Sequence, residues 1–212
     1  MPTPARTSRE AIVAAGRTIL DSDSLDGLTM SRVASAVGVR SPSLYKRVRD
    51  RGELVHLIAN AVAEDLGDRV RAAATTGDPR RDLRAMVDAL RAFAHERPES
   101  YRLLFSRLPD AWRADPDLAA RAVEPLFRAI GELAGPDHEL EGARTVVAWA
   151  RGFIDMELSG SFKLGGDVER AYAFGADHLI AAIGAARRPA PPMTGDRPAT
   201  PRKVRPDARR DR

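Results

Sequence analysis

The chain has 212 residues, of which 43% are hydrophobic and 30% charged, as in ordinary globular proteins. It contains no cysteine, which excludes disulfides, thiolate catalysis and zinc–cysteine sites. Charges interrupt every long apolar run, and the start of the chain, MPTPARTSRE, lacks the apolar core of a secretory signal. We therefore expect a cytoplasmic protein without membrane contact.

The net charge of +4 is unevenly distributed along the chain. Residues 1–54 hold nine Lys and Arg against six Asp and Glu, residues 55–186 hold 16 against 21, and residues 187–212 hold nine against three. The chain thus has a basic head (residues 1–54), an acidic body (residues 55–186) and a basic tail (residues 187–212). This asymmetry is typical of a protein of which one part binds a polyanion. The tail is also rich in proline, and we expect it to be disordered.

Helical periodicity dominates the chain and no alternating strand pattern occurs, so an all-α fold of about nine helices is predicted. The first helix is expected over residues 8–23, with Ser8 as its N-cap and one apolar face: Ile12, Ala15, Ile19 and Leu20. The second is expected to begin at Thr29, another capping residue, and to bury a single stripe: Met30, Val33, Ala34 and Val37.

A turn and a short third helix are predicted within residues 38–54, GVRSPSLYKRVRDRGEL. Gly38 suits the left-handed conformation that ends a helix. Ser41 is expected to cap the third helix, with Pro42 at its first position, where a missing N–H costs nothing. The inward face of this helix would consist of Leu44 and Val48.

Six further helices are predicted from capping residues and periodicity, with Pro125 expected to kink the seventh helix. Their expected ranges are residues 51–74, 78–95, 98–106, 115–134, 137–162 and 167–186. The predicted divisions of the chain are a head over residues 1–54, a helical body over residues 55–186, and the tail over residues 187–212.

Residues 29–48 follow the pattern of a helix-turn-helix, in which the second helix enters the major groove of DNA while nearby cations hold phosphates. Short polar or basic side chains occupy the outward positions: Arg40, Ser41, Ser43, Lys46 and Arg47. Arg51, near the start of the fourth helix, would add a phosphate contact. A solvated basic helical hairpin would have the same pattern.

The segment TMSRVASAVGVRSPSLYKRVRDRGELVHLIA resembles the DNA-binding domain of the tetracycline-repressor (TetR) family of bacterial transcription regulators. The similarity covers roughly residues 8–60 and includes the Leu-Tyr pair, the basic stretch after it and the Glu-Leu that opens the fourth helix. It favours the helix-turn-helix over the hairpin. Val48 stands where the family often has Phe, which leaves the core role intact but gives no information on the operator sequence.

The resemblance implies roles for particular residues of this segment. Four would face the DNA groove: Arg40, Ser41, Pro42 and Tyr45. Five would contact phosphates: Thr29, Ser43, Lys46, Arg47 and Arg51. Tyr45 could instead be a core aromatic that packs under its helix, and Arg49 is expected to be a solvated loop residue without a role.

The resemblance also implies a homodimer, in which the last two helices, about 139–162 and 167–186, form a four-helix bundle with those of a second copy. Small residues support close packing there: Ala143, Ala148, Gly152, Ala171, Ala173, Gly175, Ala176, Ala181, Ala182 and Gly184. Ordinary packing within one chain would explain the same residues. A weaker similarity links residues 149–158 to a Trp-His-Gly type of C-terminal domain, with Arg151 where the family usually has His.

Family resemblance further implies a small-molecule effector of unknown identity. Aromatic and apolar residues of the body could line its pocket: Phe93, Tyr101, Leu104, Phe105, Trp112, Phe127, Trp149, Phe153 and Met156. Such residues at helical spacing are more often part of a core.

The function predicted from sequence is a ligand-responsive, homodimeric repressor that binds an inverted-repeat operator. An alternative is a general DNA-coating protein with little sequence preference, in which the basic tail supplies most of the binding. An enzyme is not expected, because the four histidines are scattered and no phosphate loop, nucleophile motif or metal-ligand spacing occurs. No cofactor or metal is expected.

Overall fold

The computed structural model describes residues 8–187, and within this range the chain forms helices and connecting loops without any strand. The all-α prediction is confirmed. The residues predicted as a disordered tail lie outside the described range, apart from Arg187. Among the described residues, none of the helices is both long and apolar enough to cross a membrane.

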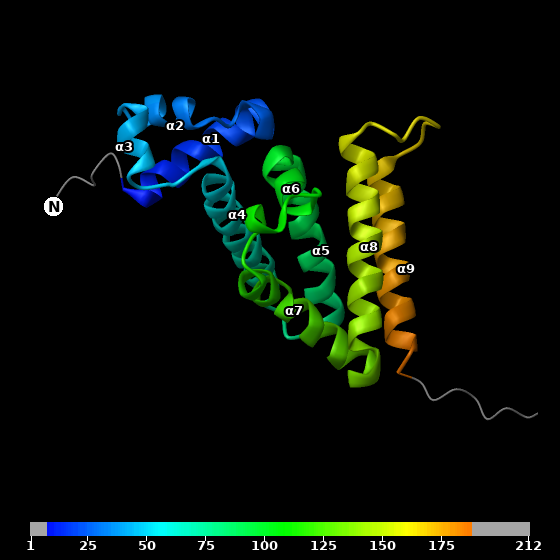
Figure 1. Ribbon diagram of the computed structural model, residues 1–212. Coiled ribbons are helices and arrows are strands. Elements are labelled where there is room, and N and C mark those ends of the chain that lie inside the picture. Colours follow the sequence, from blue (N-terminus) through cyan, green and yellow to red (C-terminus); the bar gives the residue numbers. More distant parts are fainter. Residues whose placement is uncertain (1–7, 188–212) are drawn as a thin grey trace, which may run out of the picture.

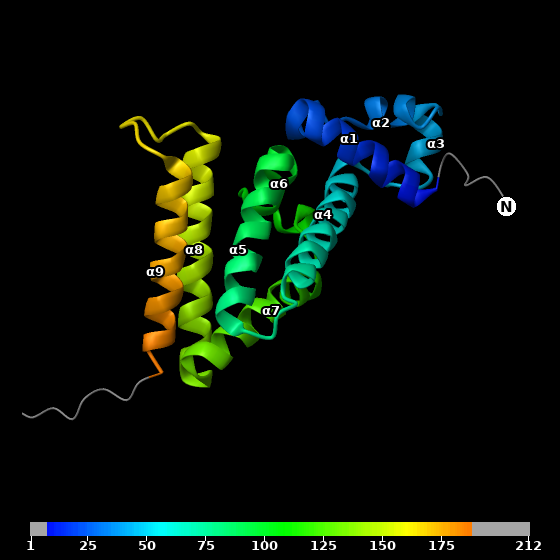
Figure 2. The same cartoon turned by 180° about the vertical axis from the view of Figure 1, so that it is seen from behind.

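The nine α-helices of the described residues form three groups (Figures 1 and 2). The head consists of α1 (Arg9–Gly27), α2 (Met30–Ala36) and α3 (Ser41–Tyr45). The centre holds α4 (Arg51–Ala73), α5 (Pro79–Glu96), α6 (Pro98–Phe105) and α7 (Pro116–Ala134). The far side from the head is the pair α8 (Glu139–Leu158) and α9 (Val168–Ala185). Two short 3₁₀ turns, η1 (Asp110–Trp112) and η2 (Pro136–His138), precede α7 and α8.

Local capping chemistry defines the starts of α1 and α2 as predicted. The side chain of Ser8 accepts a hydrogen bond from the amide of Ala11, and that of Thr29 accepts one from the amide of Arg32. Gly38 has a φ of +73°, the left-handed conformation expected after α2. Helix α1 extends beyond the predicted end, but a non-helical Ser24 with a φ of +61° interrupts it one residue after that point.

The start of α3 differs from the prediction by one residue. Arg40 is the N-cap, no side chain caps the helix, and Ser41 and Pro42 are the first two helical residues. The amide of Ser43 instead donates to the backbone carbonyl of Arg40 at 2.9 Å. A backbone bond therefore takes the place of the predicted Ser41 cap, while Pro42 still lies in the first turn, where its missing N–H is harmless.

Helix α8 is shorter than predicted at both ends. Asp137 lies in η2, and the helix begins at Glu139. At the other end, the amides of Gly160 and Ser161 donate to the carbonyls of Glu157 and Met156, and Gly160 adopts a φ of +61°. This glycine turn ends the helix at Leu158, four residues before the predicted end.

Two apolar cores fill the molecule, and α4 takes part in the first along most of its length. The first core joins head residues such as Ile12 and Leu20 to α4 and to the meeting point of α5 and α6, including Phe93 and Tyr101. The second lies between α5, α7, α8 and α9. Helix α4 therefore crosses the predicted domain boundary after residue 54 and connects head to body through buried contacts.

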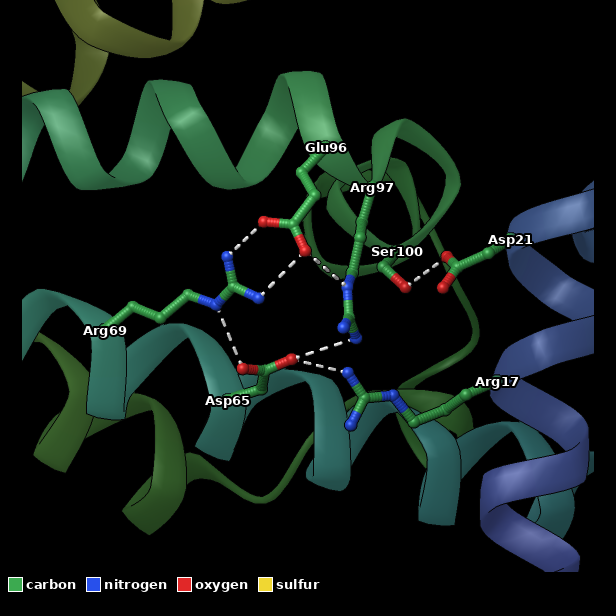
Figure 3. Close-up of polar contacts among 7 residues, drawn as sticks. All are labelled: Arg17, Asp21, Asp65, Arg69, Glu96, Arg97 and Ser100. Atoms are coloured by element: carbon green, nitrogen blue, oxygen red, sulfur yellow. Dashed lines mark hydrogen bonds and ion pairs between the residues drawn. The ribbon is translucent and has the colours of Figure 1, made fainter.

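Ion pairs reinforce this connection beside the first core (Figure 3). Asp65 of α4 accepts hydrogen bonds from Arg17 of α1 at 2.5 Å, from Arg69 at 3.1 Å and from Arg97 at 3.2 Å. Burial alone would raise the pKa of Asp65, but the hydrogen bonds from Arg17 and Arg69 outweigh it, so the pKa is lowered. Asp65 thus links three helical segments while ionised.

Three further contacts complete the set drawn in Figure 3, and in one of them Arg97 donates to Glu96 at 3.4 Å. Arg69 donates to both oxygens of Glu96, at 2.6 and 3.2 Å, which ties α4 to the end of α5. The buried Ser100 of α6 donates to Asp21 of α1 at 2.6 Å. The head is therefore held against both α4 and α6 by charged or charge-assisted hydrogen bonds.

Replacing Asp65 with Asn should lower the free energy of unfolding by about 1–3 kcal/mol, because the charge that three arginines share is lost. Urea denaturation at neutral pH measures this difference. Since the pKa of Asp65 is lowered in the folded state, the contribution is present above its ordinary pKa of 3.8 and is lost as the pH falls through the lowered value. The difference from the wild-type chain should therefore shrink on acidification.

Asp68→Asn is the matched control for this prediction. Asp68 lies one turn along α4, 74% exposed, and pairs only with Arg71. Its replacement should change stability by less than about 0.5 kcal/mol. Equal effects of the two replacements would contradict the structural role of Asp65.

Candidate functional site

Helix α3 and its flanks form an exposed surface at the end of the molecule far from α8 and α9 (Figure 1). Leu44 and Val48 are fully buried and anchor α3 on the head, as predicted. Seven of the nine predicted DNA-contacting residues have exposed side chains: Thr29, Arg40, Pro42, Ser43, Tyr45, Lys46 and Arg47. Ser41 and Arg51 are partly buried.

Tyr45 belongs to this surface rather than to the core. Its side chain is 52% exposed, so the alternative in which the ring packs beneath the helix is wrong. An aromatic ring with a hydroxyl group at the end of α3 can contact bases through its apolar face or a phosphate through its O–H.

The cations of the head fall into two classes. Arg9 pairs with Glu53 at 2.8 Å, Arg32 pairs with Asp23, and Arg49 donates to Asp50 at 2.9 Å. In contrast, within residues 8–187 no carboxylate lies within salt-bridge distance of the exposed cations around α3: Arg40, Lys46 and Arg47. The positive charge left uncompensated in the head is therefore concentrated around α3, where a polyanion would meet it.

Arg51 does not have the orientation expected of a phosphate contact. Its Nε donates to the carbonyl of Leu28 at 2.9 Å and its Nη2 to the carbonyl of Leu25 at 2.6 Å. The guanidinium also lies over the ring of Trp112, 5.3 Å from its centroid. Gly52 permits this approach, since a Cβ there would lie 2.4 Å from the indole nitrogen of Trp112. Arg51 holds the turn between α1 and α2 instead.

The nine side chains predicted for a ligand pocket do not gather in one place. Phe93 and Tyr101 are part of the first core. Trp112 lies against the start of α4, whereas Trp149 and Phe153 pack on the buried ring of Tyr172. Three others line hollows described below, namely Leu104, Phe105 and Phe127, and Met156 is exposed on α8.

A cavity of about 260 Å³ lies between α4, α6 and α7. Most of its lining is apolar and small, with Ser106 and Arg113 as the polar members: Ala59, Ala63, Leu66, Leu103, Leu104, Phe105, Ala114, Ala119, Ala122 and Val123. Because Ala59, Ala63 and Leu66 belong to α4, a molecule in this cavity would touch the helix that connects head and body.

A second hollow of about 620 Å³ is an open groove between α7 and α8. Its lining combines apolar residues with two arginines and one carboxylate: Val123, Leu126, Phe127, Ala143, Arg144, Val147, Ala148, Arg151, Gly152 and Asp155. Val123 lines both the cavity and the groove, so the two hollows adjoin. In the described part of the chain, no group of three His, Asp or Glu side chains is placed to hold a metal ion.

Similarity to known proteins identifies the family. A family model described as "Tetracyclin repressor-like, C-terminal domain" matches residues 83–179. The uncharacterized HTH-type transcriptional regulator Rv0681 of Mycobacterium tuberculosis is 30% identical over 165 residues, which cover 74% of this chain and 73% of that protein. The chain belongs to the TetR family of transcriptional regulators. The Trp-His-Gly subtype stays a prediction.

Other relatives agree with this assignment over shorter segments. The HTH-type transcriptional activator FasR of Mycolicibacterium smegmatis is 32% identical over 119 residues, covering 54% of this chain and 53% of that protein. The class E tetracycline repressor protein of Escherichia coli is 33% identical over 58 residues, 27% of this chain and 28% of that protein. TetR-family membership thus makes the chain a DNA-binding transcriptional regulator.

Solved structures share the fold at lower sequence identity. A protein of unknown function from Rhodococcus sp. RHA1 has a TM-score of 0.73 at 20% identity, with 85% of this chain and 96% of that chain covered. A TetR protein from Acinetobacter baumannii in complex with minocycline has a TM-score of 0.64 at 20% identity, with 86% and 99% covered.

Sequence reasoning missed two groups of residues at this site. The pairs of Asp65 with Arg17 and Arg97 join residues 48 and 32 positions apart, for which the sequence gives no local signal. The alanines of the cavity were also missed, although small residues on two long helices are a usable sign of space between them.

Replacing Arg51 with Ala should destabilise the fold by about 1–3 kcal/mol, because the carbonyls of Leu25 and Leu28 lose a charged donor. Thermal or urea denaturation measures this loss. Arg47→Ala removes an exposed and unpaired cation from the same head, and its stability should stay within about 0.5 kcal/mol of the parent. An unchanged free energy of unfolding in Arg51→Ala would contradict the proposal that Arg51 holds the turn between α1 and α2.

Proposed function

We propose that the protein is a ligand-responsive, homodimeric repressor that binds an inverted-repeat operator through α3. The supporting observation is the surface around α3, where exposed Arg40, Lys46 and Arg47 have no acidic partner within residues 8–187 and Tyr45 faces solvent. In this proposal α3 reads base edges, while phosphates are held by Thr29, Ser43, Lys46 and Arg47. Arg40, Ser41, Pro42 and Tyr45 are the proposed base-reading residues.

A face of α8 and α9 supports the homodimer. In the single chain its exposed side chains are mostly small or apolar: Ala148, Gly152 and Met156 on α8, and Ala171, Phe174, Ala181, Ala182 and Ala185 on α9. Phe174 is 65% exposed, which is unusual for a large aromatic side chain on a regular helix. A two-fold pairing of this face would set two heads on successive turns of DNA.

The cavity between α4, α6 and α7 supports regulation by a ligand. An effector bound there would contact Ala59, Ala63 and Leu66, all on the helix whose first turn adjoins the head. A ligand that favours one position of α4 would change the separation of the two heads and lower operator affinity. By linkage, DNA would weaken effector binding by the same factor.

A footprint on the DNA that flanks the gene of this protein tests the proposal. Protection of a short inverted repeat is the expected result for a sequence-specific dimer. Uniform retardation of any duplex, without a protected repeat, would instead support the general DNA-coating protein.

The phosphate contacts can be tested through the salt dependence of operator binding. Arg47→Ala and Lys46→Ala should each weaken binding to all sequences alike and reduce the slope of log K against log salt by roughly 0.9. Arg49→Ala is the matched control, since its guanidinium donates to Asp50, and its slope should stay at the parent value. An equal change in all three variants would argue against specific phosphate contacts by Lys46 and Arg47.

The dimer can be tested by placing a charge on its proposed face. Phe174→Glu should abolish dimerisation in sedimentation and reduce operator binding by roughly tenfold or more. The reason is that each copy would have to bury an unpaired carboxylate against its partner. Circular dichroism should remain that of a folded helical protein, since Phe174 is exposed in the single chain. Ala120→Glu, exposed on α7, is the control that should leave the dimer intact. A dimer that survives Phe174→Glu would exclude this face.

A further inference from the structure

Arg151 of α8 is a partly buried cation, and within residues 8–187 no carboxylate lies within salt-bridge distance of it. Its guanidinium carbon lies 4.4 Å from the centroid of the Phe105 ring, and Nη2 donates to the carbonyl of Phe105 at 3.4 Å. The guanidinium also lies near the hydroxyl of Tyr101, where it partly offsets the rise that burial causes in the pKa of that group. Its Nε is buried and has no hydrogen-bond partner within the described chain. A buried donor of a charged group that is left unsatisfied is costly, and native structures usually supply a partner.

The other partly buried arginines in residues 8–187 all have strong acceptors. Arg17, Arg69, Arg84, Arg91 and Arg97 pair with carboxylates, and Arg51 donates to two carbonyls. The Nε of Arg17 is also buried without a hydrogen-bond partner, but its Nη2 pairs with Asp65. Among the partly buried arginines of residues 8–187, Arg151 is therefore the one without a carboxylate or a close pair of carbonyls as acceptors.

The groove around Arg151 has the charges of a site for an anion. Arg144, which also lines the groove, has no carboxylate within salt-bridge distance in the described chain. Asp155 is the one acidic residue of the lining, and it accepts a hydrogen bond from Tyr101 at 3.1 Å. Burial and the nearby Asp155 raise the pKa of Tyr101 to about 12, so this donor stays protonated at neutral pH. Two cations therefore face one carboxylate that already has a partner.

The apolar space beside Arg151 gives the ligand its second property. Val123 lines both the groove and the cavity between α4, α6 and α7, and Phe105, which lines that cavity, lies beneath the Arg151 guanidinium. A molecule that entered along Val123 would place its apolar part among the alanines and leucines of the cavity. Its other end would remain at the guanidinium.

We propose that the effector is an amphipathic organic anion, whose carboxylate or similar head pairs with Arg151 while its apolar part fills the adjoining cavity. This rests on the proposed regulation by a ligand and names the chemical class of that ligand. Arg151 suits the task because its planar fork can donate two parallel hydrogen bonds to a carboxylate. Pairing would satisfy the orphaned donor and remove the cost of an uncompensated charge.

Calorimetric titration of the full-length protein with hexanoate, octanoate and decanoate, each compared with its neutral amide, tests the proposal. At least one carboxylate should bind about tenfold or more tightly than its amide, as a charged hydrogen bond in a partly buried site predicts. Arg151→Met, which keeps an unbranched apolar stem, should abolish this preference, and Arg151→Lys should retain part of it. Asp155→Asn should raise carboxylate affinity severalfold, since it removes the like charge.

Arg128→Met is the matched control, because Arg128 is exposed on α7, lines neither the groove nor the cavity and pairs with Glu124, so the preference of this variant for the carboxylate should be close to that of the parent. Three results would overturn the proposal. They are equal binding of acid and amide, a preference for the acid that survives Arg151→Met, and no binding by any of the three acids. Helical content and melting temperature of each variant show whether it is folded.

Release of operator DNA by the same acids separates this inference from the proposed function. Binding through Arg151 without release would leave the anion site standing and refute regulation by this ligand. Release by the amides as readily as by the acids would refute the anion site and leave ligand regulation standing.

Discussion

The structure depends on one helix that must pack in two places at once. The buried side of α4 meets the head at Ile58, where Gly16 of α1 lets the two helices approach closely, and meets the body further along at Leu66. A Cβ on Gly16 would lie 2.5 Å from the end of the Ile58 side chain. Because protein interiors are close-packed, a change in the position of α4 at one end cannot be absorbed by loose contacts. The head and the body are therefore mechanically linked through buried apolar contacts.

The ion pairs around Asp65 lie beside this packing and favour one orientation of the packed helices. Apolar contacts tolerate small sliding movements, whereas a carboxylate shared by Arg17, Arg69 and Arg97 favours one arrangement of α1, α4 and the α5–α6 junction. The cavity lies on the same helix, with Ala63 and Leu66 flanking Asp65 in sequence. The cavity proposed for the ligand and the ion pairs that hold the head thus share a short segment of α4.

Local chemistry made the head predictable. The caps at Ser8 and Thr29, the left-handed Gly38 and the buried Leu44 and Val48 depend on neighbours within a few residues, and all five agree with the structure. The role of Arg51 could not be predicted, since its acceptors lie 23 and 26 residues earlier in the chain. The nine residues predicted for a ligand pocket are dispersed for a different reason. Large aromatic side chains such as Phe93 fill space, and the cavity, which Leu104 and Phe105 do line, forms where alanines leave room.

The contact of Arg51 with Leu25 and Leu28 bears on how a displacement of α4 would be transmitted. Arg51 is the first residue of α4, and its guanidinium holds the turn that leads into α2. A tilt of α4 would therefore carry α2 and α3 along as one rigid body, with the recognition surface undistorted. In a dimer, such a movement would change the distance and angle between the two recognition surfaces. Regulation would therefore alter how the two surfaces match the spacing of the half-sites, and would leave the base preference within each half-site unchanged.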